Sequence, residues 1–461
     1  MIKRYAIFLV LVMSIVTFSC FEISYAAQGG HSWVKTENFV PPEWAEKHSG
    51  KFSGELSFTT TEMHTTPAKL PVRYPWATWF GWGYPMNLLA AQDPPEAVPL
   101  FDLDAKLFPG LEVEFFTTDD GDLVPIQRSI IRKPVIDRTE SFWEIIVGPG
   151  KVWQDNKNQE KRWKGWNKAA FPFSLVQSQE GQALLGLAFF YYKDSEVSKL
   201  YFQVSNDAGG GFIFWDDYWN MTAWGEADIT YTPGTIKKEK AIMKAFKREV
   251  ANRLPMKPLS ELGDDVSGMG AGISQKNVQK NVLTMAMVVD GEIYYSPIST
   301  PFGEYPPLYL PSMRVGVWSA SKSLIPGMAA LRLVQKYGPD FLDTKIVDYF
   351  EEGAEFNYID DEAKARWKMV TIDHALHMTT GMGPAGYDPN WAWYAENTYL
   401  WSYSYDLADQ IWYYFNQGPN PEVDGPGEAL YYMDQDMWIA PSPWSVFCSR
   451  KKVRMRLSLI C

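Results

Sequence analysis

Short apolar runs alternate with turn residues along the N-terminal half of the chain, a pattern typical of antiparallel β-strands. These runs are rich in aromatic and β-branched side chains and cover residues 111–116, 123–131, 142–147, 183–192 and 200–204. An Asp-Gly turn at Gly121 separates the first two and predicts a β-hairpin. The sequence therefore predicts a mainly β, sandwich-like domain in this half.

Helical spacing replaces this pattern at residues 236–252, where apolar side chains recur every three or four positions between Lys and Glu. The glycine-rich segment 267–274 follows and predicts a flexible joint, so we place a domain boundary near residue 262. The β-rich domain then spans 27–262 and ends in a helical linker.

Strand and helix patterns mix beyond that boundary. Residues 282–289 and 292–295 flank Asp290-Gly291 and predict a second hairpin, and helical patterns cover residues 322–337 and 372–380. The second domain, residues 263–461, is therefore expected to be α+β.

The composition is that of a globular protein, with 461 residues and 46% hydrophobic side chains. A net charge of −12 argues against nucleic acid as a partner, because phosphate binding needs clustered positive charge. The three cysteines are too few to form a disulfide scaffold. This length favours two domains.

The first 26 residues have the pattern of a signal peptide. Lys3 and Arg4 precede an apolar run, and small residues follow at Ala26 and Ala27. The run is too short to span a bilayer, and Cys20 lacks the small residues that precede lipid-attachment sites. We expect a secreted or periplasmic protein with no membrane span after the signal is removed.

Ser319 and Lys322 form the pattern that carries chemistry. A serine three residues before a lysine at a helix start places both side chains on one helical face. A neutral lysine amine can accept the serine proton as the oxygen attacks a carbonyl carbon. The partial positive charge of the helix N-terminus lowers a lysine pKa and directs N–H groups at a developing oxyanion.

Two other serines, Ser32 and Ser449, also precede a lysine by three residues, but no helical pattern follows them. After Ser319 the residues Leu324, Met328, Leu331 and Leu333 or Val334 predict the apolar stripe of a packed helix. Pro326 interrupts this helix, and we expect it to lie near the start or to cause a kink.

The segment 318–323, Trp-Ser-Ala-Ser-Lys-Ser, resembles the nucleophile motif of the serine β-lactamase-like hydrolases, which include class C β-lactamases, penicillin-binding DD-peptidases and related esterases. The similarity covers roughly residues 265 to 440 and includes 338–349 and 370–382, where Thr371 is a suitable N-cap and Gly381 a suitable helix stop. The resemblance implies a β-lactamase/transpeptidase-like fold, an acyl-enzyme on Ser319, and activation by Lys322.

A second family motif places a tyrosine two residues before an asparagine, shortly after Pro-Gly. Pro426-Gly427 here precede Tyr432, which the resemblance makes a proton shuttle or co-base, and Asp434, which stands at the substrate-binding amide position. A carboxylate offers no N–H to a substrate, and close to Lys322 it raises the lysine pKa and reduces its basicity.

The third family motif, Lys-Thr-Gly or His-x-Gly on a following strand, is absent from the sequence. Residues 441–461 instead carry five basic and no acidic side chains. We therefore expect the catalytic domain to be truncated or altered after about residue 440.

No cofactor or metal is expected. His374 and His377 share a helix face, but a zinc site needs further ligands at close range, so we interpret them as packed or surface histidines. The many aromatic residues of the N-terminal half are expected to pack inside the sheet rather than to form a glycan-binding platform.

Three functions are consistent with these observations. The first is an exported serine hydrolase acting on an ester, amide or β-lactam carbonyl of a small-molecule or peptide-like substrate. The second is a catalytically weak or inactive binding protein of the same fold, which Asp434 and the missing third motif favour. The third assigns the function to residues 28–262, as a cell-wall glycan-binding domain.

Overall fold

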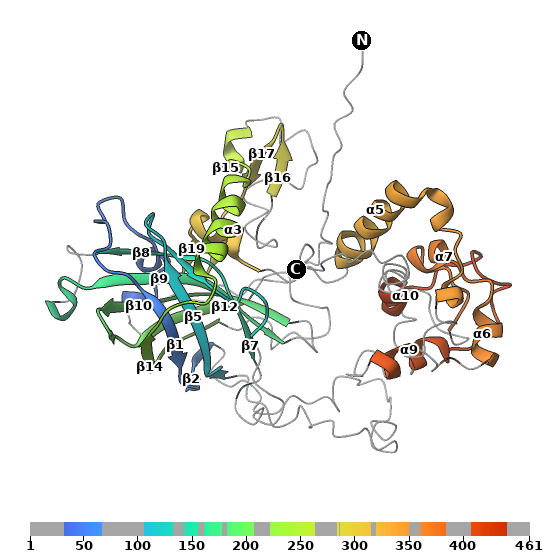
Figure 1. Cartoon of the computed structure of the whole chain (residues 1–461), viewed down its shortest axis with the longest axis horizontal. Coiled ribbons are helices and arrows are strands. Elements are labelled where there is room, and N and C mark those ends of the chain that lie inside the picture. The colour runs from blue at the N-terminus through green and yellow to red at the C-terminus, as the bar shows by residue number, and fades with distance from the viewer. Residues whose placement is uncertain are drawn as a thin grey trace, which may run out of the picture. The chain divides into compact units, whose positions relative to one another are not determined.

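The computed structural model describes residues 32–66, 106–131, 141, 143–154, 161–177, 182–206, 222–262, 284, 286–314, 320–349, 359, 361–383 and 407–439. By its contacts the chain divides into two units, Met1–Gly316 and Val317–Cys461. The described part of the first is built mainly of strands and that of the second of helices, so this is a mixed α/β protein (Figure 1). The predicted signal peptide and the basic tail lie outside the described residues.

One large curled antiparallel sheet of twelve strands dominates the first unit (Figure 1). The hydrogen-bonded order is β14-β1-β5-β6-β8-β9-β10-β12-β13-β3, with β7 on β9 and β11 on β10. The strands are β1 Ser53–Phe58, β3 His64–Thr66, β5 Leu111–Thr117, β6 Asp122–Pro125, β7 Glu144–Val147, β8 Gly150–Gln154, β9 Asn167–Gln177, β10 Gln182–Lys193, β11 Glu196–Val197, β12 Leu200–Asn206, β13 Thr222–Ala227 and β14 Ile229–Pro233. The sequence predicts a sandwich-like domain, whereas these strands form one continuous sheet.

The hairpin predicted around Gly121 is confirmed. Strand β5 pairs with β6, with Thr117 opposite Leu123, and Gly121 in the turn has a φ of 79°. A φ in this range is strained for residues with a side chain, which explains a glycine at this place. The predicted strands at 183–192 and 200–204 correspond to β10 and β12.

Two glycines make room for aromatic rings within the sheet. Gly186 on β10 lies opposite Phe173 on β9, and a Cβ at Gly186 would come within 2.2 Å of the Phe173 ring. Gly225 lies opposite Phe202 in the same way. The buried Phe108 ring contacts Phe173 edge-on and stacks on Phe202 at a centroid distance of 4.2 Å. These aromatic residues pack internally, as the sequence analysis expects.

A segment beyond the predicted boundary at 262 packs on this sheet. It contains β18 (Ile298–Thr300), β19 (Gly303–Tyr305) and the 3-10 helix η8 (Pro307–Ser312). The buried hydroxyls of Tyr305 and Tyr309 donate hydrogen bonds to the carbonyls of Leu185 and Phe39, at 3.0 and 2.6 Å. The contacts within the chain therefore place the division between the two units at Gly316. The domain boundary near residue 262 remains a prediction from the sequence.

Smaller elements complete the described part of the first unit. They are the strands β2 (Thr61–Glu62), β4 (Leu107–Phe108), β15 (Met256–Pro258), β16 (Ala286–Val289) and β17 (Glu292–Tyr295), the helix α3 (Glu239–Ala251), and the 3-10 helices η2 (Ser32–Val34), η3 (Thr36–Phe39) and η6 (Lys161–Trp163). Helix α3 confirms the amphipathic pattern and buries Phe246 against Phe116. The predicted Asp290-Gly291 hairpin joins β16 to β17. No helix among the described residues is long and apolar enough to cross a membrane.

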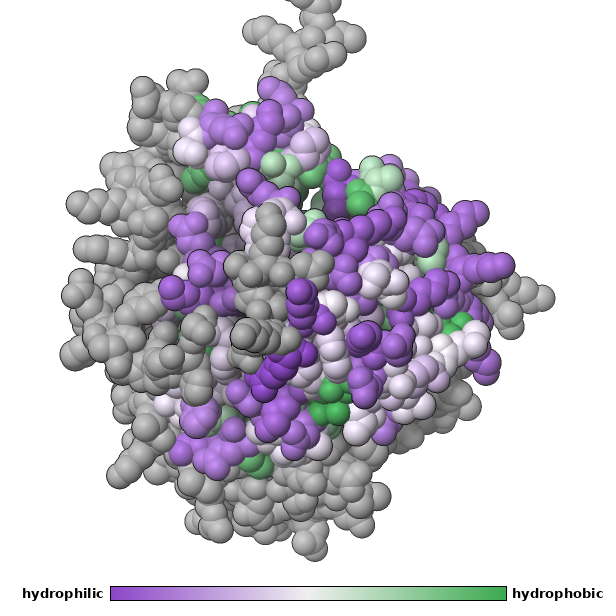
Figure 2. Space-filling view, turned by 90° about the vertical axis from the view of Figure 1, so that its left-hand side faces the viewer, coloured by the Kyte–Doolittle hydropathy of each residue, from purple (hydrophilic) through white to green (hydrophobic). Residues whose placement is uncertain are grey.

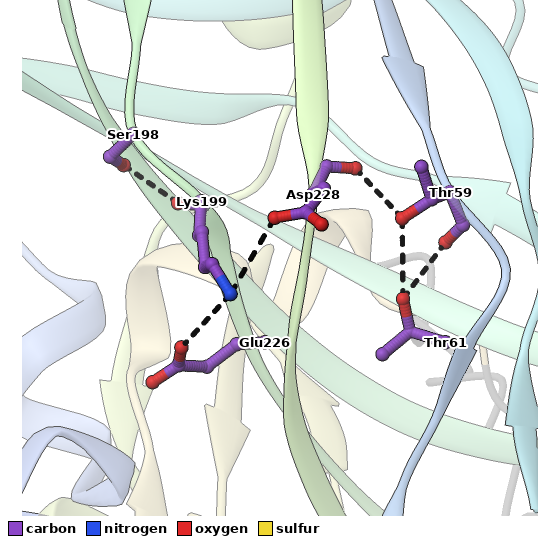
Figure 3. A network of polar contacts seen from close by, with 6 residues as sticks. All are labelled: Thr59, Thr61, Ser198, Lys199, Glu226 and Asp228. Carbon is purple, nitrogen blue, oxygen red and sulfur yellow. Dashed lines mark hydrogen bonds and ion pairs between the residues drawn. The ribbon is translucent and has the colours of Figure 1, made fainter.

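Polar contacts link the ends of several strands at the surface of the first unit (Figure 3). Lys199 lies between two carboxylates, 3.5 Å from Asp228 and 3.9 Å from Glu226, and the Thr59 hydroxyl donates to the Asp228 carbonyl. Ion pairs as exposed as those of Lys199 contribute little stability.

The face of the molecule in Figure 2 is mostly hydrophilic where it is described, with hydrophobic residues in small separate patches.

Helices and short turns of helix make up the described part of the second unit. They are η10 (Ser323–Gly327), α5 (Met328–Tyr337), η11 (Pro339–Phe341), η12 (Ile346–Tyr349), α6 (Asp361–Trp367), α7 (Ile372–Leu376), α9 (Leu407–Phe415) and α10 (Asp434–Ile439). Their core centres on the fully buried Trp367, whose indole N–H donates to the Phe415 carbonyl at 2.9 Å. Of the residues singled out from the sequence, Lys322 directly precedes η10 and Asp434 begins α10.

The Gly186–Phe173 contact leads to a stability prediction. Gly186→Ala should lower the free energy of unfolding of the first unit by about 1–3 kcal/mol, the usual cost of overpacking, because the Phe173 ring must move. Urea unfolding followed by tryptophan fluorescence measures this. Gly234→Ala is the control, since its Cβ would meet only one atom, at 4.0 Å. Equal stability of the two variants would contradict the prediction.

Candidate active site

Lys322 lies on the first helical turn of the predicted nucleophile helix, just before η10. Ser319 lies outside the described residues. The five residues of η10 form a π-helical stretch around the buried Pro326, which has no N–H to donate to the preceding turn. Pro326 therefore lies near the start of the helix, as one of the two alternatives predicts, and the helix accommodates it by a local widening rather than by a kink, which was the other alternative.

The prediction of which helix face after Ser319 is buried is wrong. Leu324, Met328 and Leu331 are 39%, 58% and 65% exposed, whereas Leu333 is buried. The buried face of α5 instead runs through Ala329 and Leu333. Helix α5 is apolar on more than one face, and its spacing alone does not determine which face contacts the core.

Tyr432 lies on the irregular segment just before α10, in which buried and partly exposed residues alternate. Tyr431 and Met433 are buried, while Tyr432 and Asp434 are partly exposed. The Tyr431 N–H donates to the Met378 carbonyl at 2.9 Å, so the segment is attached to the loop after α7. Tyr432 and Asp434 are therefore accessible at the surface, whereas Tyr431 and Met433 pack into the core.

The loop that holds this segment begins where α7 ends. Thr371 caps α7 as predicted, with its side chain accepting from the His374 N–H. The helix stops at Leu376, earlier than Gly381, and Met378 takes the left-handed conformation with a φ of 52°. The Thr379 N–H then donates to the His374 carbonyl, which closes a Schellman motif.

Lys322, Tyr432 and Asp434 come together in the second unit, although Lys322 is far from the other two in the sequence. The Lys322 Nζ lies 2.6 Å from Asp434 Oδ1 and 4.7 Å from the centre of the Tyr432 ring. The lysine side chain is 13% exposed and the aspartate side chain 47%. The ion pair therefore lies at the surface on its acidic side and is largely buried on its basic side.

This environment raises the pKa of Lys322. Burial alone lowers it, but the Asp434 carboxylate and the hydrogen bonds to Asp434 and Tyr432 together outweigh burial. Lys322 is therefore an ammonium at neutral pH, the effect that the sequence analysis expects from an acidic residue at position 434. A protonated lysine cannot accept a proton from serine.

A buried carboxyl group close to this site was missed by the sequence analysis. Asp436 in α10 is 1% exposed, and it accepts hydrogen bonds from the hydroxyls of Tyr414 at 3.1 Å and Thr380 at 3.3 Å. Burial raises its pKa to about 8, although both hydrogen bonds act in the opposite direction. No sequence signal marks it, because acidic residues are common in the first turn of exposed helices.

The two histidines have separate partners. His374 Nδ1 accepts from the Thr371 N–H and completes a capping box, while His377 Nδ1 lies 3.3 Å from Asp373 Oδ1. Within the described ranges, no group of three His, Cys, Asp or Glu side chains is arranged to hold a metal ion. His374 thus serves to start α7.

Removing the Asp434 charge should lower the pKa of Lys322. In Asp434→Asn the burial that disfavours the ammonium remains, while the charge that stabilises it is gone. NMR titration of the Lys322 side chain measures this pKa, with Asp343→Asn, an exposed site, as the control. A Lys322 pKa that does not change in Asp434→Asn contradicts the electrostatic role of the pair.

Asp436 should make stability depend on pH. Between about pH 4 and pH 8 the folded protein keeps a proton that the unfolded chain has lost. Its contribution to stability therefore falls as pH rises, by at most about 1.4 kcal/mol per pH unit. In Asp436→Asn this dependence is absent, so urea unfolding at pH 5 and pH 7.5 should show the variant gaining on the wild type. If the difference in the free energy of unfolding between wild type and variant is the same at both pH values, the Asp436 carboxyl group is not protonated in the folded protein.

No family model, curated protein or solved structure matches this chain. The resemblance to the β-lactamase-like hydrolases consequently rests on the motifs in the sequence. The contact between Lys322 and Tyr432 is consistent with this resemblance, because the second family motif predicts these two residues at one site. The family and its fold therefore stay predictions.

Proposed function

We propose that this chain is an exported serine hydrolase of the β-lactamase-related type, which acts on an ester, amide or β-lactam carbonyl. One observation supports this most. Lys322 and Tyr432 belong to two separate motifs of the sequence, and their side chains lie together in the second unit. Export rests on the signal-like segment at 1–26.

The proposed reaction proceeds through an acyl-enzyme. The Ser319 oxygen adds to the carbonyl carbon, and its proton passes to Lys322, which must first be neutral. The leaving group departs with a proton delivered through Tyr432, and water then hydrolyses the serine ester. Because the Asp434 carboxylate stabilises the ammonium form of Lys322, the reaction should be slow at neutral pH and faster in alkaline solution.

A second candidate follows from the same ion pair. With Lys322 held as an ammonium by Asp434, the protein could bind a carbonyl compound without turning it over. In this alternative the chain is a catalytically weak binding protein, and Asp434 lies at the position that contacts the substrate in the family.

Covalent labelling with a fluorophosphonate or a fluorescent penicillin distinguishes the two. For a hydrolase, we expect labelling of the full chain that increases from pH 7 to pH 10 and is lost in Ser319→Ala and Lys322→Ala. Ser32→Ala is a matched control, because Ser32 also precedes a lysine by three residues. It should be labelled like the wild type.

Asp434→Asn sharpens this test. Each unit by which the Lys322 pKa falls increases its neutral fraction about tenfold, and the labelling rate at pH 7 should increase in parallel. A silent wild type with a labelled Asp434→Asn variant supports the binding protein. No labelling of either folded protein at any pH contradicts the hydrolase.

A further inference from the structure

The carboxyl group of Asp436 connects three segments of the second unit. It lies on α10, while its partners Tyr414 and Thr380 come from α9 and from the loop after α7. Both partners are buried, at 0% and 2% exposure. The Thr380 oxygen also accepts from the Met382 N–H at 3.5 Å, so this hydroxyl is itself held in place. The orientation of the Asp436 side chain is therefore fixed from two sides.

Asp436 is two residues from Asp434 on a helix of only six residues. Gln435, Asp436 and Ile439 face the core, and Asp434 begins the helix on its more exposed side. A short helix has little stability of its own, so its position depends on its packing contacts. A rotation or shift of its first turn would move Asp434 away from the Lys322 ammonium.

A buried carboxyl group is an expensive way to fill a core. Transfer of a polar group from water costs free energy that its hydrogen bonds only partly return, and an apolar side chain of similar size packs without this cost. What hydrogen bonds add is direction, because they are satisfied in only one arrangement of the partners. The choice of residue at position 436 therefore suggests a need for exact placement.

We propose that Asp436 is a positioning residue, whose hydrogen bonds to Tyr414 and Thr380 hold the first turn of α10 where Asp434 pairs with Lys322. Asp436 acts through Asp434 and touches neither Lys322 nor a substrate. Its influence on hydrolysis rests on the proposed function. Its influence on the ion pair does not.

The test is a double-mutant cycle read by the NMR titration of Lys322 in the full chain, without substrate. Tyr414→Phe removes its hydrogen bond to Asp436, and Thr380→Val removes its hydrogen bond to Asp436 together with the acceptor of the Met382 N–H. Both substitutions keep the shape of the side chain. Each should lower the pKa of Lys322 by at least about half of the fall seen in Asp434→Asn. In the Asp434→Asn background the same two substitutions should change the pKa no further, because the charge they position is already gone.

A purely structural role gives a different result. The variants would then unfold at lower urea concentrations while the Lys322 pKa stayed at its wild-type value in each folded variant, and this overturns the proposal. Additive falls in the Asp434→Asn background also overturn it. Tyr337→Phe is the control, since it removes a tyrosine hydroxyl elsewhere in this unit. Because the readout is a pKa, failed labelling of Ser319 would refute the hydrolase and leave this test intact.

Discussion

An ammonium group with little access to water needs a negative charge nearby, and this requirement governs the arrangement of the candidate site. The Lys322 side chain is 13% exposed, and Asp434 supplies the compensating charge at 2.6 Å. For this, the segment that carries Tyr432 must end, and α10 must begin, next to Lys322 in the second unit. The Schellman turn after α7 and the hydrogen bonds to Asp436 provide that place.

Local patterns in the sequence predict local structure well here. The Asp-Gly hairpin at Gly121, the amphipathic helix α3 and the Thr371 cap depend on residues within one turn or one helix, and each is found where it is expected. The contact between Lys322 and Tyr432 could be predicted only from the family motifs. Spacing cannot pair residues that are so far apart in the chain.

Other features depend on contacts that no local pattern reveals. The apolar residues around α5 fit more than one face, and the core selects Ala329 and Leu333 over Leu324 and Met328. Likewise, one curled sheet and two packed sheets use the same alternating strands, and the distinction lies in which strands pair. The burial of Asp436 has the same origin, because its partners come from other elements.

The ion pair has two opposing effects on the proposed chemistry. It fixes the lysine amine beside Tyr432, which a proton-transfer site needs, and it also keeps that amine protonated, which such a site cannot use. Deprotonation of Lys322 would leave the carboxylate alone, but Asp434 is 47% exposed and water can solvate its charge. The ion pair therefore mainly raises the pKa of Lys322, and its loss has a smaller effect on the stability of the site. In this geometry Lys322 is an ammonium at neutral pH and becomes a base only in alkaline solution, so the same ion pair is consistent with either of the two proposed functions.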